Sequence, residues 1–458
     1  MMSIASRPDL PEAKLRLDLA TRLVFPVVEH LIPETLDAAL LCCCQGEWRF
    51  DLLSPARMLR LELLQACRPH QSFQETLREV WQTWRLTGAV TGAIPSSAAL
   101  AQARARTPLW ACETLFRHTA SLVAELARQP LCPEFRLLSV DGIPLVLPRT
   151  QALLDHFGTT SNQRGDNYYP QATAVWVVQL PGRGVLAEWL GSANHSDQNV
   201  APRLLPSVLR ASDLVLGDAH IGTFPNLSVI RSAGASFLVR APANLLPEKH
   251  VLLRHSEAEL EIRLGPTYHV RTHYPDFRFP DHLDMRALRF PIPSCDACNG
   301  VEIATFLTDL PRNLFPLDRA AAIAALRWDQ ETIHGDVKTR MGLGDIRSQT
   351  PAGVHREVFA HLCCANFLRT LLSNTPVLEL LNSSFTAALS ALRQANQQLR
   401  LLPARQPEIV QVLQEMICTQ HIAVRPGRSE PRKRRPSKRP FPYFTTPRSL
   451  WRQARKAG

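Results

Sequence analysis

One segment, residues 319–341, carries an acidic and two basic side chains at spacings suited to phosphate chemistry. Its content of Ala, Leu, Glu, Lys and Arg predicts a helix of several turns with Asp318 as the N-cap. Arg327 and Glu331 are four residues apart and Lys338 is seven further on, so at 3.6 residues per turn all three project from one face. Such a face either forms a solvated ladder of ion pairs or binds one anionic partner.

Two aspartates earlier in the chain stand beside apolar segments. Asp141 precedes a glycine within 135–147, a pattern that predicts two β segments around a hairpin-like turn, where aspartate is commonly structural. Asp218 follows the apolar run 214–216 and a glycine, so we expect its carboxylate at the carboxyl end of a strand, where α/β active sites gather. Asp213 is the competing acid, and it would lie at the opposite end of that strand.

Three carboxylates from separate segments, Asp141, Asp218 and Glu331, form a candidate metal site. Hard cations such as Mg²⁺ prefer carboxylate oxygens and retained waters. Two Mg²⁺ ions about 4 Å apart activate an attacking hydroxyl and stabilise the leaving oxygen in phosphodiester chemistry, and Mn²⁺ is the expected substitute. Arg327 and Lys338 would then hold phosphates.

Three residues near Glu331 are secondary candidates. Trp328 is a candidate for stacking on a DNA base, with a core position as its alternative. His334 falls on roughly the same face as Glu331 and either contacts DNA or packs as an ordinary helix histidine. Gly335 in mid-helix costs about 1 kcal/mol relative to alanine, so we expect a close approach of another backbone or of DNA there.

The amino-terminal part of the chain supplies helices. Residues 1–128 show helical periodicity with short polar breaks. A helical module of this size is typical of a helix-turn-helix reader of DNA or of a packing and dimerisation domain. The helices are expected at 11–25, 33–44, 55–68, 72–84 and 96–106.

The pattern becomes β-like near residue 134 and helical again after residue 310. Strands on both sides of Asp141, followed by one at 172–180, suggest a meander with a polar loop at 159–170. A short helix is expected within 202–210. Further strands are expected at 237–240, 251–253, 260–264, 288–290 and 301–308, and further helices at 354–372 and 385–399.

Positive charge is concentrated at the carboxyl terminus. The 458 residues are 45% hydrophobic and 20% charged, as in a globular chain of about three domains, and the net charge is +11. Residues 425–458 hold twelve Lys or Arg and one acid, whereas basic and acidic side chains balance in the rest. Prolines interrupt this basic run, so it is expected to be extended and to bind phosphate backbones without reading sequence, or to act as a solubilising tail. Its central cations are Lys433, Arg434 and Arg435.

Cysteine usage and hydropathy indicate a cytoplasmic protein. The eleven cysteines include consecutive ones in apolar runs at 42–44 and 363–364, a pattern of buried thiols in a reducing compartment. Cys295 and Cys298 form a C-x-x-C without a second ligand pair at zinc-ribbon spacing. No apolar run approaches the roughly 20 residues of a membrane span, and no signal-peptide core is present.

The order of Asp141, Asp218 and Glu331, with a β-rich stretch between the last two, resembles the DDE transposases of bacterial insertion sequences, specifically the insertion-sequence-four family. The resemblance covers most of the chain. It extends to the basic tail and to the segments 96–108, 140–148, 216–222, 341–351 and 383–389.

The signature of that family is Tyr, two residues, Arg, three residues, Glu, six residues and Lys. Arg327, Glu331 and Lys338 match it, whereas Ala324 stands at the position of the tyrosine. Ala219 likewise stands where a basic residue often follows the second aspartate. The acids are intact, so these departures indicate either tuning of the activity or its reduction.

The resemblance implies an α/β protein with an RNase H-like catalytic core interrupted by a β-rich insertion. Its members cut and paste DNA: metal-activated water nicks the element's terminal inverted repeats, and the freed 3′ hydroxyl is joined to target DNA. A homodimer on double-stranded DNA is the expected assembly. The implied domains are a helical DNA-binding or dimerisation domain (1–128), the two halves of the core (129–232 and 311–424), the insertion (233–310) and the basic tail (425–458).

Two alternatives remain open from the sequence. One is an RNase H-like nuclease that cuts DNA without strand transfer, and the other is a catalytically decayed DNA-binding derivative. The amino-terminal helices are the first candidate for reading the DNA sequence, and the β-rich insertion is the second.

Overall fold

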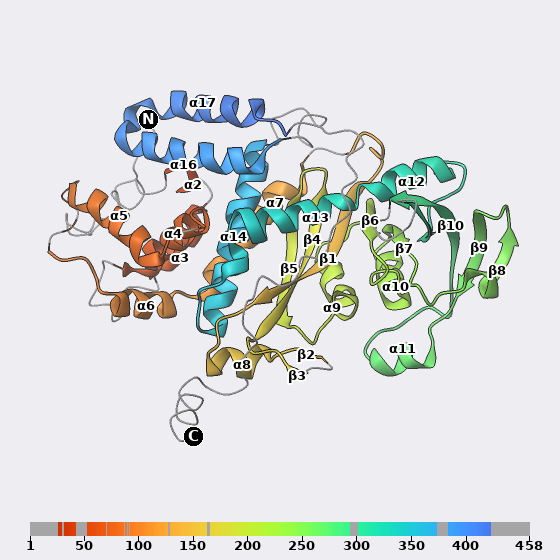
Figure 1. Ribbon diagram of the computed structural model, residues 1–458. Coiled ribbons are helices and arrows are strands. Elements are labelled where there is room, and N and C mark those ends of the chain that lie inside the picture. The colour runs from red at the N-terminus through yellow and green to blue at the C-terminus, as the bar shows by residue number, and fades with distance from the viewer. Residues whose placement is uncertain are drawn as a thin grey trace, which may run out of the picture. The chain divides into compact units, whose positions relative to one another are not determined.

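The computed structural model (Figure 1) describes residues 26–29, 32–42, 53–69, 71–86, 88, 90, 92–126, 129–162, 165–293, 301–372 and 383–422. These residues form a mixed α/β protein with a nine-stranded sheet and many helices. The chain divides into two compact units. The first comprises Met1–Ser139, Trp176–Glu188 and Trp328–Ala423, and the second comprises Val140–Val175, Trp189–Arg327 and Val424–Gly458. The five domain boundaries inferred from the sequence stay predictions.

The sheet has the strand order β5-β4-β1-β6-β7-β11-β10-β9-β8. β6 pairs with β7 in parallel, whereas β7–β11, β11–β10, β10–β9 and β9–β8 are antiparallel pairs. β6 to β11 lie in the second unit, and β1, β4 and β5 contribute residues to both units. The strands are β1 (Arg136–Val146), β4 (Gln171–Leu180), β5 (Gly184–Ser192), β6 (Asp213–Gly217), β7 (Ser236–Arg240), β8 (Val251–Arg254), β9 (Glu259–Leu264), β10 (Leu283–Pro293) and β11 (Val301–Thr308).

A parallel crossover in the second unit positions the loop that follows β6. All five residues of β6 are buried, as expected for an inner strand with both faces covered. The chain then passes through α10 (Phe224–Ser232) into β7, which pairs with β6. Pro225 near the start of α10 suits the first helical turn, where its missing N–H is not needed. Residues 218–223 therefore lie between the carboxyl end of β6 and the amino end of α10.

The second unit contains further short elements. A small antiparallel pair joins β2 (Ser161–Asn162) and β3 (Gly165–Asp166). The helices besides α10 are α8 (Gln151–Phe157), α9 (Asp197–Leu204), α11 (Tyr268–His273) and α12 (Leu317–Ala325), with 3₁₀ turns at Leu205–Ser207 and Pro247–His250.

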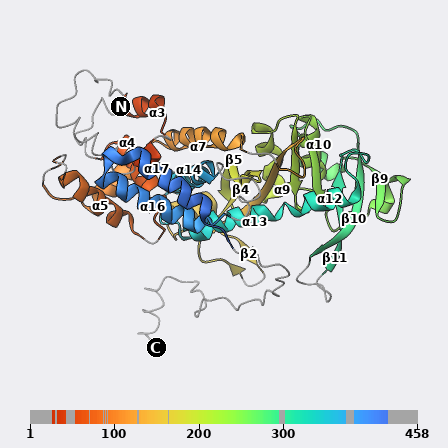
Figure 2. The ribbon, with the colours of Figure 1, turned by 90° about the horizontal axis from the view of Figure 1, so that it is seen from above.

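The first unit is mainly helical. α14, a helix of 22 residues, is buried along most of its length and packs against α4 and α7. α16 and α17 lie side by side in both views (Figure 1 and Figure 2). The helices are α2 (Pro26–Glu29), α3 (Glu34–Cys42), α4 (Pro55–Ala66), α5 (Phe73–Leu86), α6 (Ser97–Arg106), α7 (Leu109–Ala124), α13 (Trp328–His334), α14 (Pro351–Leu372), α16 (Phe385–Leu401) and α17 (Gln406–Thr419), with a π-helical turn η4 (Gly335–Arg340) and a 3₁₀ turn η5 (Leu343–Asp345).

Most elements expected from periodicity are confirmed, including the strand that begins at Asp213 and ends just before Asp218. The hairpin expected around Asp141 is wrong, because β1 runs straight through that residue. The glycine after it lacks the positive φ that a tight hairpin turn requires. The polar loop at 159–170 contains the β2–β3 pair instead of being irregular throughout. The expected helix at 11–25 lies outside the described residues.

Two helix boundaries differ from the predictions. The helix expected within 202–210 is α9, which begins at Asp197 and gives way to a 3₁₀ turn at Leu205. α12 begins one residue before Asp318, with Pro316 as its N-cap, so Asp318 lies in the first turn and does not cap the helix. α10 and α17 were not anticipated, since a short buried helix between two strands and a helix next to the basic tail leave weak local signals.

Candidate active site

Asp141 lies in the middle of β1 in the second unit. One carboxylate oxygen, Oδ1, accepts the backbone N–H of Gly142 at 2.8 Å. A Cβ atom at position 142 would lie 3.2 Å from the Cβ of Asp197. The glycine therefore leaves the space in which Asp197 stands close to Asp141.

Asp218 begins the loop after β6, and its Oδ1 accepts two backbone N–H groups of that loop. The donors are His220 at 2.9 Å and Ile221 at 3.4 Å. These bonds fix the carboxylate at the carboxyl end of a buried strand. The structure thus confirms the place that the sequence predicts for Asp218.

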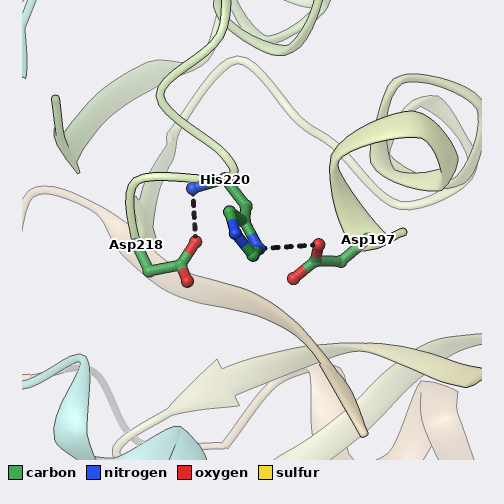
Figure 3. A group of neighbouring side chains, drawn as sticks. All are labelled: Asp197, Asp218 and His220. Carbon is green, nitrogen blue, oxygen red and sulfur yellow. Dashed lines mark hydrogen bonds and ion pairs between the residues drawn. The ribbon is translucent and has the colours of Figure 1, made fainter. Parts of the chain in front are cut away.

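His220 lies between two carboxylates (Figure 3). Its Nδ1 is 3.1 Å from Oδ1 of Asp197, which is buried at the start of α9. The ligand atoms of Asp197, Asp218 and His220 all lie within 4.8 Å of one another. Two acids and an imidazole, from the start of α9 and from the loop after β6, therefore converge on one point of the second unit.

The charges of these acids act on one another. Burial first, and then the neighbouring carboxylates of Asp218 and Asp197, raise the pKa of the Asp141 carboxyl to about 7. The Gly142 N–H and the Arg327 guanidinium oppose the shift in this pKa, and Arg327 NH1 lies 4.0 Å from Asp141 Oδ2. The second unit thus gathers more negative charge around Asp141 than Arg327 offsets.

Glu331 and Lys338 belong to the first unit. Glu331 is exposed on α13, and Lys338 is half-buried in η4, where burial lowers the pKa of its ammonium group. The structure brings together Asp141, Asp218 and Arg327 in the second unit. The placement of Glu331 and Lys338 beside them stays a prediction.

The prediction of one continuous helix over 319–341 is wrong. α12 ends at Ala325, Arg327 lies in a turn, α13 follows, and residues 335–340 form the π-helical η4. A π turn holds more residues than an α turn, so the 3.6-residue spacing that put Arg327, Glu331 and Lys338 on one face does not apply.

A buried ion network lies at the π turn. Within η4, the nearly inaccessible Asp336 accepts hydrogen bonds from Arg340 and from Arg369 of α14. Arg369 is itself buried, and a buried guanidinium without a partner is costly, so Asp336 has to face it. On α13, Asp329 pairs with Arg183 at 2.8 Å. The segment that carries Glu331 and Lys338 is therefore anchored by ion pairs inside the first unit.

The three secondary candidates have different environments. Trp328 has 57% of its surface exposed, so the core alternative is wrong for this residue. His334 packs edge-on against Trp176 with 5.4 Å between the ring centroids, and its Nε2 lies 3.3 Å from Gln330 Nε2, as in an ordinary packed histidine. At Gly335 a Cβ atom would have only the side-chain Nη1 of Arg340 near it, at 4.0 Å, so the close approach of another backbone expected there is wrong among the described residues, and the approach of DNA stays a prediction.

Other sequence predictions fall on different parts of the chain. Cys363 and Cys364 are buried thiols, as predicted. Lys433, Arg434 and Arg435, together with Cys295 and Cys298, lie outside the described residues. Among the helices that the structure describes, none is long and apolar enough to cross a membrane.

The sequence reasoning missed Asp197 and His220 as members of the site. His220 offered a local signal, because it follows Asp218 by two residues in a loop after a buried strand. Asp197 offered none, since it opens a short helix in a polar stretch and meets Asp141 only through the fold.

The residues of this site fit a divalent cation. Carboxylate oxygens are the donors that Mg²⁺ and Mn²⁺ prefer, and an imidazole nitrogen is a further ligand type for transition metals. The pKa of Asp141 is raised first by its burial and then by the negative charge of Asp218. A cation held by Asp141 and Asp218 would compensate that charge.

Similarity to known proteins covers the region that contains these acids. A family model described as "Transposase DDE domain" matches residues 133–367, about half of the chain. No curated protein matches the chain. A solved structure, the cryo-EM structure of the piggyBac transposase synaptic complex with hairpin DNA, aligns at 10% identity with a TM-score of 0.39, over 95% of this chain and 91% of that chain.

Proposed function

Because the chain belongs to the transposase DDE domain family, it is a DNA transposase that depends on divalent metal ions, and we propose that it moves an insertion sequence by a cut-and-paste reaction. In this proposal Asp141, Asp218 and Glu331 are the metal-binding acids and the ions are two Mg²⁺. The observation that carries it is the meeting of Asp141, in β1, and Asp218, just after β6, at one site where acidic side chains outnumber the cation beside them.

The proposed ions would activate the attacking hydroxyl and stabilise the leaving oxygen of the phosphodiester. Asp218 is held ready for this role by two backbone N–H groups, which keep its carboxylate at the end of β6. Asp141 is fixed by the N–H of Gly142. Both side chains are thus oriented by the backbone before any ligand binds.

The cations near these acids are proposed to bind phosphate. Nη1 of Arg327 stands 4.0 Å from Oδ2 of Asp141, so the guanidinium lies beside a proposed metal-binding acid, where a DNA phosphate would also be held. Lys338 is proposed as the second phosphate contact and the exposed Trp328 as a surface that stacks on a base.

The finer family assignment is also a proposal. We assign the chain to the insertion-sequence-four family on the spacing of Arg327, Glu331 and Lys338. Ala324 stands at the tyrosine position, so this chain lacks a phenol there. It lies on α12 and is buried, with 8% of its surface exposed. We also propose an RNase H-like core and a homodimer on the element's terminal inverted repeats, with the basic tail adding sequence-independent contacts to target DNA in the cytoplasm.

Cleavage of a duplex that carries the element's own end tests the proposal. Wild-type protein should nick the end with Mg²⁺ or Mn²⁺ and not with chelator, and Asp141→Ala should abolish nicking. Asp276→Ala is the matched control, because it removes an exposed acid of the same unit outside this cluster.

Three outcomes would change the proposal. Binding without cutting under either metal would indicate a decayed DNA-binding derivative, and Ala324→Tyr would then be the first restoration to test. Nicking without joining to target DNA would indicate a nuclease. Unchanged nicking in Asp141→Ala would show that the acids are wrongly assigned.

A further inference from the structure

The mixed cluster of Asp197, Asp218 and His220 offers donors of two chemical kinds. Among the residues that the structure describes, it is a group of acidic and imidazole side chains whose ligand atoms lie within 4.8 Å of one another. Of the three acids that match the family's catalytic residues, the cluster includes only Asp218. Asp197 and His220 are therefore additions that the signature residues do not explain.

The cluster is built by buried contacts behind it. Asn226, fully buried on α10, directs its side-chain amide at two backbone carbonyls, those of Gln198 and His220, each at 3.4 Å. The same amide donates to Thr223 Oγ1 at 3.2 Å. One side chain thus ties the start of α9, which carries Asp197, to the loop that carries His220.

The separation of Asp197 and His220 suits two ligands of one ion. In an octahedral site with ligands at about 2.1 Å, two adjacent ligand atoms lie about 3.0 Å apart. Nδ1 of His220 and Oδ1 of Asp197 are 3.1 Å apart. Opposite ligands of such an ion lie about 4.2 Å apart, so the third donor, from Asp218, is within a small side-chain adjustment of binding.

Packing in the core does not account for the position of the His220 side chain. Its side chain is 63% exposed, whereas that of Asp197 is 9% exposed. An exposed imidazole adds little to the core, and an exposed ion pair adds little to stability. The exposed imidazole is therefore better explained by binding of a ligand than by packing in the core.

We propose that Asp197 and His220 join Asp218 as ligands of one divalent ion, so that this site holds its metal through an imidazole nitrogen as well as carboxylate oxygens. The inference rests on the proposed function, because it concerns the metal that the family's reaction requires. For His220 to bind through Nδ1, that nitrogen must be deprotonated, and the hydrogen bond to Asp197 is then replaced by shared binding of the ion.

A nitrogen ligand changes which metal the site favours. Mg²⁺ prefers oxygen donors, whereas imidazole suits transition metals. Removing the imidazole should therefore weaken the binding of Mn²⁺ more than the binding of Mg²⁺. Removing the carboxylate of Asp197 should weaken the binding of both ions.

The test is Mn²⁺ binding to the full-length chain, read by pulsed electron paramagnetic resonance, which detects a nitrogen bonded to the ion. Wild type should show the nitrogen signal, and His220→Gln should lose it and bind Mn²⁺ roughly tenfold more weakly, with a smaller change for Mg²⁺. His255→Gln is the matched control, because His255 also pairs with a carboxylate, Glu261 at 2.7 Å, in the same unit outside the cluster. Circular dichroism checks that His220→Gln folds, as an exposed position should allow.

The outcomes separate this inference from the proposed function. If wild type binds Mn²⁺ and cleaves DNA but shows no nitrogen signal, the inference is wrong and the proposed function stands. A nitrogen signal that persists in His220→Gln would also overturn the inference. If wild type neither binds metal nor cleaves, both are wrong.

Discussion

Replacing Asp141 with asparagine should stabilise the metal-free protein while abolishing cleavage. The pKa of this carboxyl is raised from 3.8 to about 7, mainly by burial. At roughly 1.4 kcal/mol per pKa unit, ionised Asp141 costs the fold up to about 4 kcal/mol at pH 8. Asparagine is neutral, has nearly the same shape, and can still accept the Gly142 N–H. We therefore expect Asp141→Asn to be about 2–4 kcal/mol more stable than wild type at pH 8.

The difference should depend on pH with a definite sign. Because the folded pKa lies above the unfolded one, the folded wild type binds more protons between about pH 4 and pH 7, and its stability falls as pH rises through that window. The advantage of Asp141→Asn should shrink to roughly 1–2 kcal/mol at pH 5 and stay constant above about pH 7.

Urea unfolding of both proteins in chelator, from pH 5 to pH 8, measures this difference. Asp276→Asn is the control for losing an exposed acid of the same unit. Added Mg²⁺ should stabilise wild type more than Asp141→Asn, because the variant lacks the Asp141 carboxylate that is proposed to bind an ion beside Asp218. A variant that is less stable than wild type, or a difference that does not grow with pH, would refute the account of Asp141 as a buried acid whose charge Arg327 offsets only in part.

Three further predictions follow from other parts of the chain. Glu331→Gln should abolish nicking of a cognate end, measured by gel cleavage, while its affinity for the duplex, measured by fluorescence anisotropy, stays unchanged. The control is Glu34→Gln, which changes another exposed glutamate, and nicking at the wild-type rate would remove Glu331 from the proposed acids. Asp336→Ala should lower the free energy of unfolding by about 3–5 kcal/mol, because it leaves the buried Arg369 without this partner, and an unchanged urea midpoint would contradict that. Deleting residues 426–458 should weaken binding to any duplex and flatten the slope of log K against log salt by about 0.9 for each DNA phosphate that the tail neutralises, and an unchanged slope would count against a DNA-binding tail.

The buried network around η4 bears on how the proposed Lys338 would be positioned. Its ammonium group is half-buried, and burial lowers its pKa, so a negative phosphate is a favourable neighbour for it. The adjacent Asp336 is held by Arg340 and Arg369, which limits the freedom of the π turn. We expect the effect of Asp336→Ala on cleavage to exceed its effect on duplex affinity.

The sequence by itself was enough to select Asp141 and Asp218 as candidate site residues and to predict the strand before Asp218. A run of three apolar residues ending in Gly-Asp is typical of a buried strand followed by a loop, since burial on both faces removes alternation. The order of two aspartates and a glutamate is a property of the linear chain, so the family was accessible without any structure.

Only the tertiary structure decided which other side chains meet these acids. Asp197 joins Asp141 because Gly142 leaves room beside a neighbouring strand, and Arg327 reaches Asp141 from a turn between two helices. On either side of the π turn's start, α13 and η4 form ion pairs with Arg183 and Arg369, which are distant in sequence. Periodicity reports only local burial, and contacts between distant segments leave no trace in it.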